Sequence, residues 1–186
     1  QRAFTNANLG GMGWDLPAAI GASVANNRKR AILVTGDGSI QFNVQELETV
    51  KYYKLPIKIF IFNNDGYESI RFTQNSFFSG LFVGSDRKSG VSNPNFHRIA
   101  QAHDLHYEKI QTNKDITRKI KKVLAFPGPV VCEVFLSPTQ GRVPKSASFR
   151  REDGTLESRP LEDMYPFLPR KELWENMHLF DKEETK

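Results

Sequence analysis

The sequence is poor in cysteine and has no long apolar run, and these absences exclude several classes of protein. One cysteine, Cys132, among 186 residues cannot form an internal disulfide framework. It favours a reducing compartment, so we expect the cytoplasm. No apolar stretch approaches the roughly 20 residues that cross a bilayer, and Gln1 to Gly10 lack the pattern of a secretory signal. We therefore expect no membrane partner.

Long blocks of one charge sign are also missing. The formal net charge is +5, but the basic residues are scattered along the chain. The densest cluster, Arg118 to Lys122, has helical periodicity, which favours a solvated helix face over a nucleic-acid site. We expect no nucleic-acid partner, although a modest excess of cations would suit an anionic cofactor or substrate.

Three short apolar runs predict the strands of an α/β fold. They are nearly continuous and rich in β-branched or aromatic residues, which is typical of parallel strands covered on both faces. Helical patterns alternate with them over residues 16–26, 43–53, 95–102 and 114–126. The runs are Ala31 to Thr35, Ile57 to Phe62 and Val130 to Phe135. This order predicts a three-layer α-β-α domain with a mostly parallel sheet over residues 1–138.

Two segments differ from this pattern. Gly66 to Ser92 holds four phenylalanines among Gly, Ser and Asn with weak periodicity. This is typical of a functional loop or lid, and partly helical packing against a partner is the alternative. Residues 139–186 begin polar and basic, and apolar residues return from Pro160 to Phe180. We interpret them as a C-terminal extension that docks on its own domain or on another subunit.

Polar clusters follow the first two predicted strands. Gly36-Asp37-Gly38-Ser39 ends the first strand and Asn63-Asn64-Asp65-Gly66 ends the second, with Ser39 to Phe62 between the motifs. Carboxyl ends of parallel strands meet at one edge of a sheet, where ligands bind in open α/β folds. Both clusters should therefore border one crevice.

These residue types suit a metal ion and a phosphate group. The Asp37 carboxylate and the Asn64 side-chain carbonyl are hard oxygen donors for Mg²⁺, which fills its other positions with phosphate oxygens and water. Gly36 and Gly38 allow a sharp turn and a close approach to an anion, and amides at the following helix N-terminus can donate to phosphate. Either motif alone is an ordinary turn, so it is their combination that predicts the site.

The combination resembles the diphosphate-binding signature of thiamine-diphosphate (ThDP) enzymes. In this chain 24 residues separate Gly36-Asp37-Gly38 from Asn63-Asn64. Leu9 to Ala22, LGGMGWDLPAAIGA, is similar to the corresponding segment of acetolactate synthases and related 2-oxoacid decarboxylases, and Ser39 to Lys51 is close to the same branch. The likeness covers residues 8–136 and implies the C-terminal, diphosphate-binding domain of a larger enzyme.

The resemblance implies contacts with both ends of the cofactor. Gly38 and Ser39 would contact the diphosphate beside Gly36. Gly10 and Met12 would face the aminopyrimidine ring, with the Met12 side chain holding the cofactor bent. A methionine in a glycine-rich loop can also simply fill a gap, and that structural interpretation of Met12 stays open.

The resemblance also implies a magnesium site within an incomplete catalytic centre. Asp37 and the Asn64 side chain would bind Mg²⁺, with the main-chain oxygen of Gly66 as a third protein ligand. The activating glutamate would come from a pyrimidine-binding domain of the same or another subunit, because nothing here resembles that domain. An opening strand and helix normally precede the equivalent of Gln1. We therefore expect a fold that is truncated at its N-terminus and little turnover by this chain alone. The longer enzyme would be a homo-oligomer, and FAD could bind elsewhere in it.

The implied reaction is decarboxylation of a 2-oxoacid such as pyruvate, followed by ligation to a second carbonyl compound. Another 2-oxoacid or a keto-sugar nucleotide is the candidate acceptor. The stretches Arg151 to Gly154 and Pro160 to Met164 resemble acetolactate synthase-like proteins linked to cell-surface sugar biosynthesis. Simple decarboxylation is an alternative, although Ile70 stands where decarboxylases often carry a catalytic glutamate. A non-catalytic or split ThDP-fold subunit and an unrelated nucleotide-binding domain also remain open.

Overall fold

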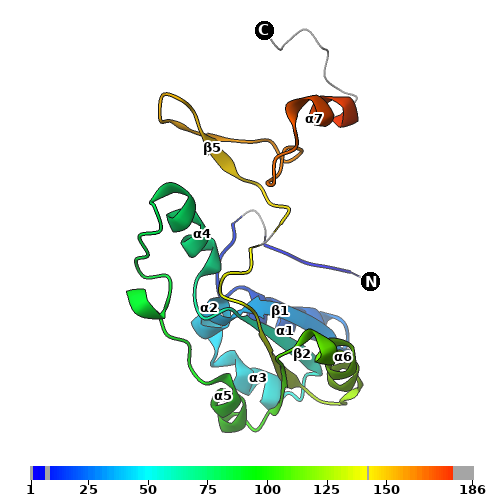
Figure 1. Cartoon of the computed structure of the whole chain (residues 1–186). Coiled ribbons are helices and arrows are strands. Elements are labelled where there is room, and N and C mark those ends of the chain that lie inside the picture. The colour runs from blue at the N-terminus through cyan, green and yellow to red at the C-terminus, as the bar shows by residue number, and fades with distance from the viewer. Residues whose placement is uncertain (1, 7–8, 142, 178–186) are drawn as a thin grey trace. The chain divides into compact units, whose positions relative to one another are not determined.

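Four parallel strands form the sheet around which the first part of the chain folds (Figure 1). The structure is a computed structural model that describes residues 2–6, 9–141 and 143–177. The strand order is β1-β2-β4-β3, and every neighbouring pair is parallel. The elements of this unit, which extends to Gln140, are α1 (Asp15–Ala25), β1 (Ala31–Gly36), α2 (Asp37–Ile40), η1 (Gln41–Asn43), α3 (Glu46–Tyr52), β2 (Ile57–Asn63), α4 (Glu68–Phe77), η2 (Arg87–Ser89), α5 (Phe96–Ala102), β3 (His106–Ile110), η3 (Asn113–Asp115), α6 (Ile116–Ala125) and β4 (Val130–Phe135).

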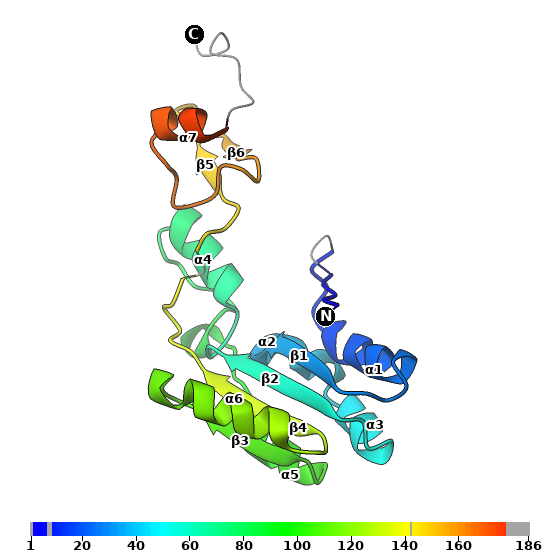
Figure 2. The same ribbon diagram turned by 90° about the vertical axis from the view of Figure 1, so that its right-hand side faces the viewer.

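Helices cover both faces of the sheet, and the predicted three-layer α/β domain is confirmed. Helices α1, α3 and α5 pack on one face, where their apolar side chains meet Leu33, Ile59 and Val131. Helix α6 covers β3 and β4 on the opposite face (Figure 2), where Val123 packs with Val130. Strands β2 and β4 read as continuous apolar runs because both of their faces are buried.

The edge strand β3 is the part of the sheet that the apolar pattern did not predict. Strands β1, β2 and β4 coincide with the three apolar runs to within one residue. Strand β3 has the sequence HYEKI, with a charged or polar residue at most positions. It lies at the sheet edge, where only one neighbour pairs with it. A strand at the edge buries less of its surface than a central strand, so it needs fewer apolar residues, and its sequence resembles that of a loop.

The segment Gly66 to Ser92 is partly helical. It contains α4 in its first half and the short η2 turn near its end. Helix α4 extends beyond the carboxyl end of the sheet in both views (Figures 1 and 2). The Gln74 amide donates to the Val83 carbonyl oxygen at 2.9 Å and its oxygen accepts from the Ser85 hydroxyl at 2.7 Å. The helix and the return segment therefore form one hydrogen-bonded structure.

The second unit, from Gly141, is a short hairpin followed by a helix. Strand β5 (Ser148–Arg150) pairs antiparallel with β6 (Leu156–Ser158), and α7 spans Arg170–Met177. The buried Asp163 accepts hydrogen bonds of 2.6 and 2.8 Å from the Arg170 guanidinium, which ties α7 to the preceding loop. The boundary after residue 138 and the docking of residues 139–186 stay predictions, and the apolar positions 179 and 180 lie outside the described residues.

Cys132 is buried in β4, and burial raises the pKa of its thiol to about 12, so the thiol stays protonated. Within the described ranges, every helix is too short or too polar to cross a membrane.

Glu108 ties the edge strand β3 to helix α6. Its buried carboxylate accepts hydrogen bonds from Lys119, at 2.7 Å, and from Lys122. Burial opposes ionisation, but the two ammonium groups outweigh it and hold the pKa of Glu108 at about 2, below its ordinary 4.5. Because the folded-state pKa is lowered, this stabilisation is present above the ordinary pKa and is lost as the pH falls toward 2.

We predict that Glu108→Gln lowers the free energy of unfolding by about 2 kcal/mol at neutral pH, because charge-assisted hydrogen bonds are lost. The gap between variant and wild type should close as the pH falls from about 5 to about 2, since protonation of Glu108 removes the same interaction. Urea unfolding at a series of pH values measures both effects. An equal gap at neutral and acidic pH would contradict the assignment.

Candidate functional site

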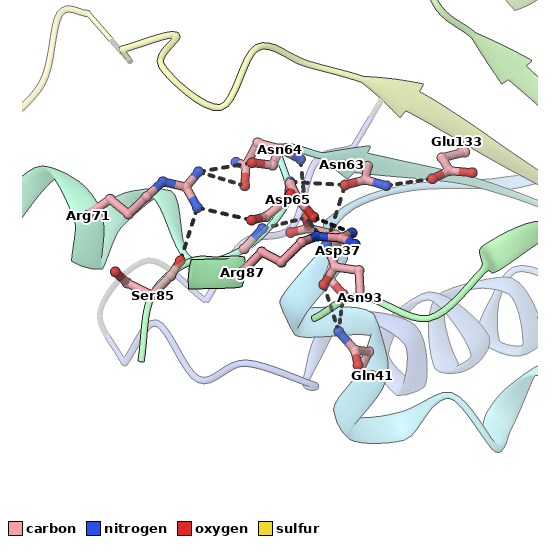
Figure 3. Close-up of polar contacts among 11 residues, drawn as sticks. Asp37, Gln41, Asn63, Asn64, Asp65, Arg71, Ser85, Arg87, Asn93 and Glu133 are labelled. Carbon is pink, nitrogen blue, oxygen red and sulfur yellow. Dashed lines mark hydrogen bonds and ion pairs between the residues drawn. The ribbon is translucent and has the colours of Figure 1, made fainter. Parts of the chain in front are cut away.

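Two turns meet at the carboxyl ends of β1 and β2 (Figure 3). Strand β1 ends at Gly36, and α2 begins at the next residue. Strand β2 ends at Asn63 and continues into a turn in which Asp65 and Gly66 have positive φ angles. The parallel pairing sets Gly36 beside Phe62. The two polar turns are therefore neighbours at one edge of the sheet.

The buried carboxylate of Asp37 joins the two turns. Its Oδ2 accepts the backbone N–H of Asn64 at 3.2 Å, the backbone N–H of Gly66 at 3.1 Å and the side-chain amide of Asn93 at 2.5 Å. Its Oδ1 accepts the backbone N–H of Gly38 at 2.9 Å. Each carboxylate oxygen has about two lone-pair sites. Counting the described residues, Oδ2 is fully occupied, whereas Oδ1 keeps a lone pair that a cation can use.

Position 66 accepts only glycine. Gly66 has a φ of +133°, which side chains rarely adopt. A Cβ there would lie 2.5 Å from the Ser85 carbonyl oxygen and 2.8 Å from Nη1 of Arg71. Gly66 also forms an isolated antiparallel bridge with Asp86. The turn after β2 is thus pressed against the segment that returns from α4.

A buried arginine on α4 clamps the same turn. Arg71 is 7% exposed, and its Nη2 donates to the Asn64 carbonyl oxygen at 3.0 Å and to the Asn64 side-chain oxygen at 3.4 Å. Its Nη1 donates to the carbonyl oxygens of Ser85 at 3.0 Å and Asp65 at 3.3 Å (Figure 3). The Asn64 side-chain oxygen is therefore directed toward Arg71 and not toward Asp37. Its contact with Arg71 is long and weak.

The turn before α1 is tied to the first turn through Asp15. The Asp15 Oδ2 atom accepts the Ser39 hydroxyl at 2.8 Å and the Thr35 hydroxyl. The Ser39 hydroxyl oxygen in turn accepts the Gly13 N–H at 3.0 Å. The Ser39 side chain therefore has a structural task, which is to hold the glycine-rich turn against the end of β1.

Met12 and Tyr67 border Gly38. A Cβ on Gly38 would lie 2.4 Å from a ring carbon of Tyr67 and 3.5 Å from the methyl carbon of Met12. Met12 itself is 42% exposed, so it reaches the site without being packed into a core. Gly10 lies in an exposed turn, and a Cβ there would have no atom within 4 Å. The structure thus brings Met12 to Gly38 but places Gly10 against none of the other predicted site residues.

A chain of polar side chains leads from Asp37 across the sheet. Asn93, which donates to Asp37, also donates to the Asn63 side-chain oxygen at 3.3 Å. The Asn63 amide donates to Glu133 on β4 at 2.6 Å, and the Tyr107 hydroxyl on β3 donates to the other oxygen of Glu133. Burial and this bond to Glu133 raise the pKa of Tyr107, so its hydroxyl remains a donor. The sequence motif included Asn63, but Asn93, Glu133 and Tyr107 were not singled out from the sequence.

Comparison with known proteins identifies the family. Residues 1–134 match the thiamine pyrophosphate enzyme, C-terminal TPP binding domain family. The chain belongs to this family. The acetolactate synthase large subunit of Cyanidium caldarium is 36% identical over 144 residues, which are 77% of this chain and 24% of that protein. The mitochondrial acetolactate synthase of Schizosaccharomyces pombe is 36% identical over 133 residues, which are 72% of this chain and 19% of that protein.

A solved structure shares the fold of this TPP-binding domain. The thiamine diphosphate-dependent 4-hydroxybenzoylformate decarboxylase of Rhodococcus jostii RHA1 has 31% sequence identity and a TM-score of 0.62, over 69% of this chain and 24% of that one. The family and fold implied by the sequence resemblance are therefore confirmed. The matched part of the chain spans 24% and 19% of the lengths of the two curated relatives named above. The described site, from Met12 to Glu133, lies inside the matched region.

We predict that Gly66→Ala destabilises the domain by about 3 kcal/mol, because backbone strain adds to the clash with the Ser85 carbonyl and Arg71. Gly84→Ala is the matched control. Gly84 also has a positive φ, +59°, but a Cβ there has no atom within 4 Å, so only the strain of about 1 kcal/mol remains. Chemical unfolding measures both variants, and equal losses would show that position 66 is not crowded.

Proposed function

We propose that this chain binds Mg²⁺ and the diphosphate of ThDP at the ends of β1 and β2. The supporting observation is the buried Asp37 carboxylate, which keeps one lone pair of Oδ1 beside the Asn64–Gly66 turn. Within the described residues, His, Cys, Asp and Glu side chains form no group of three that could hold a metal ion. A metal held here must use one carboxylate with amide and main-chain oxygens. That donor set fits Mg²⁺, which takes its other ligands from phosphate and water.

Three protein oxygens would hold the metal ion. Asp37 would be the charged ligand, the side-chain oxygen of Asn64 the second and the main-chain oxygen of Gly66 the third. Asn64 would exchange its weak 3.4 Å contact with Arg71 for the metal. Arg71 would keep the Asn64 main chain in place during this exchange through its 3.0 Å bond to the carbonyl oxygen.

The remaining assigned residues would contact the organic part and the diphosphate of the cofactor. The diphosphate would lie beside Gly36, Gly38 and Ser39. Position 38 has no room for a side chain, because a Cβ there would displace Tyr67. The Ser39 hydroxyl would also keep the glycine-rich turn attached to β1. Gly10 and Met12 would face the aminopyrimidine ring, and the partly exposed Met12 side chain supports this assignment.

The reaction we propose for the whole protein is decarboxylation of a 2-oxoacid such as pyruvate and ligation of the product to a second carbonyl compound. The acetolactate synthases among the relatives support this proposal. Bound ThDP supplies the nucleophilic carbon and the electron sink for loss of CO₂. This chain would bind and orient the diphosphate end, and a pyrimidine-binding domain of the same or another subunit would supply the activating glutamate in a homo-oligomer.

A 2-oxoacid decarboxylase without ligation is the second candidate. The structural relative with a decarboxylase activity in its name favours it. Ile70, where the resemblance to decarboxylases leads one to expect a glutamate, opposes it. The first turn of α4 does contain a glutamate, Glu68, but it lies two residues before position 70.

We predict that Asp37→Asn weakens Mg²⁺-dependent binding of ThDP by about 100-fold, because the only charged ligand is lost while the side chain keeps its size. Isothermal titration calorimetry measures this on the protein with its pyrimidine-binding domain present. Asp104→Asn, which changes an exposed aspartate at the end of α5, is the control and should bind like wild type. Unchanged affinity in Asp37→Asn would refute the proposed metal site.

We also predict that the assembled protein converts pyruvate to CO₂ and a ligated product only when both Mg²⁺ and ThDP are supplied. Product analysis by mass spectrometry distinguishes ligation from simple release of an aldehyde. Aldehyde as the sole product would favour the decarboxylase, and no turnover despite tight cofactor binding would favour a non-catalytic subunit.

A further inference from the structure

The hydrogen-bonded chain behind Asp37 has a direction, and Glu133 determines it. A carboxylate only accepts hydrogen bonds, so Asn63 presents its NH₂ group to Glu133 at 2.6 Å. The carbonyl oxygen of Asn63 then faces the opposite way. There it accepts from the Asn93 side chain at 3.3 Å and from the Asp65 backbone N–H at 3.0 Å. Glu133 on one side and the Asp65 N–H on the other therefore orient the amide of Asn63.

Asn93 passes this orientation on to Asp37. Because the Asn63 oxygen is an acceptor, Asn93 turns its NH₂ group toward it, and the same group donates to Asp37 Oδ2 at 2.5 Å. The Asn93 oxygen accepts from Gln41 at 3.1 Å, and Gln41 also donates to the Asp37 main-chain oxygen at 3.0 Å (Figure 3). Two side-chain amides, those of Asn63 and Asn93, therefore connect the Glu133 carboxylate to the Asp37 carboxylate. Each carboxylate accepts a hydrogen bond from an NH₂ group.

Glu133 is an unusual residue to find in the centre of the sheet. It is 6% exposed, and among the described residues no basic group forms an ion pair with it. Its partners are the Tyr107 hydroxyl and the Asn63 amide. A buried carboxylate is costly unless its hydrogen bonds are satisfied, and a satisfied buried network orders the groups that it connects. The network that starts at Glu133 ends at Asp37, so the groups that it orders include the Asp37 carboxylate.

We propose that Glu133 is a positioning residue for the Asp37 site, because it sets, through Asn63 and Asn93, the orientation in which Asp37 leaves Oδ1 open to a cation. Its consequence for cofactor affinity rests on the function proposed above. The orientation itself is a property of the chain without any ligand and can be measured separately.

Two isosteric substitutions give a matched comparison. Glu133→Gln keeps the side-chain shape but adds an NH₂ donor, so the Asn63 amide can turn round and Asn93 loses its acceptor. Glu108→Gln is the control, because Glu108 is also 6% exposed and lies on the adjacent strand β3. Its carboxylate bonds to the α6 lysines and takes no part in the chain to Asp37.

The first test is amide hydrogen exchange by NMR on the ligand-free chain. The N–H groups of Asn64 and Gly66 report on Asp37, since both donate to its Oδ2. Glu133→Gln should speed their exchange about tenfold, the factor expected when roughly one hydrogen bond is lost. Glu108→Gln should change the exchange of these two amides no more than it changes that of the core amides of β2, which report the general loss of stability. If Glu133→Gln does not fold, Tyr107→Phe removes one of the two hydrogen bonds that hold the Glu133 carboxylate in place. The acceptor for Asn63 is then held less firmly, and the same two amides should exchange faster by a smaller factor.

The second test is calorimetry with Mg²⁺ and ThDP on the protein with its pyrimidine-binding domain. Glu133→Gln should weaken ThDP binding about tenfold, at the lower end of the range for residues that orient a metal ligand. Asn93→Ala should weaken it at least as much. The double variant should lose no more than Asn93→Ala alone, because both substitutions break one chain.

The outcomes separate the two proposals. Exchange of the Asn64 and Gly66 amides that is no faster, relative to the core amides of β2, in folded Glu133→Gln overturns the positioning role, as does an equal relative effect in Glu108→Gln. Additive losses of affinity in the double variant overturn it as well. Wild-type protein that binds no ThDP would refute the proposed function instead, and the exchange measurement would still decide whether Glu133 orders the site.

Discussion

One buried carboxylate holds the functional edge of this domain together. The turn after β2 presents two backbone N–H groups, those of Asn64 and Gly66, and both donate to Asp37 at the end of β1. Leaving buried donors without partners would cost about 1–3 kcal/mol each, so the turn depends on Asp37 for its shape. The same carboxylate offers the lone pair assigned to the metal ion. In the proposed site, structural and binding demands therefore converge on this side chain, and the residues around it would orient it.

The sequence was sufficient for the parts of the fold that depend on burial and topology. Two-sided burial gives β2 and β4 nearly continuous apolar runs, each with one charged residue inside. Parallel topology alone requires the turns after β1 and β2 to be neighbours. The edge strand β3 was not predicted, because most of its residues are polar or charged and it has no apolar run. The side chains that contact the site residues were not predicted for another reason. Arg71 and Asn93 come from segments without a strong period, and only the tertiary fold brings them to Asn64 and Asp37.

Charged residues inside predicted buried strands were a signal that sequence reasoning could have used. Lys58 lies in the apolar run of β2 and Glu133 in that of β4. A buried charge must find partners, and the two residues do so differently. Lys58 donates to the carbonyl oxygens of Phe126, at 2.5 Å, and Gly128, and burial lowers the pKa of its ammonium group. It closes the turn before β4, whereas Glu133 connects to the site, and only the structure distinguishes the two cases.

In the proposed site, the protein oxygens of Asp37, Asn64 and Gly66 share one metal ion with the diphosphate of ThDP. Anomalous X-ray diffraction from crystals of the protein grown with ThDP and Mn²⁺ in place of Mg²⁺ tests it most directly. We expect one manganese peak within bonding distance of the Asp37 carboxylate and of the Asn64 side-chain oxygen, with Asn64 turned away from Arg71. Bound ThDP with its manganese ion coordinated elsewhere, and Asn64 still bonded to Arg71, would contradict the account.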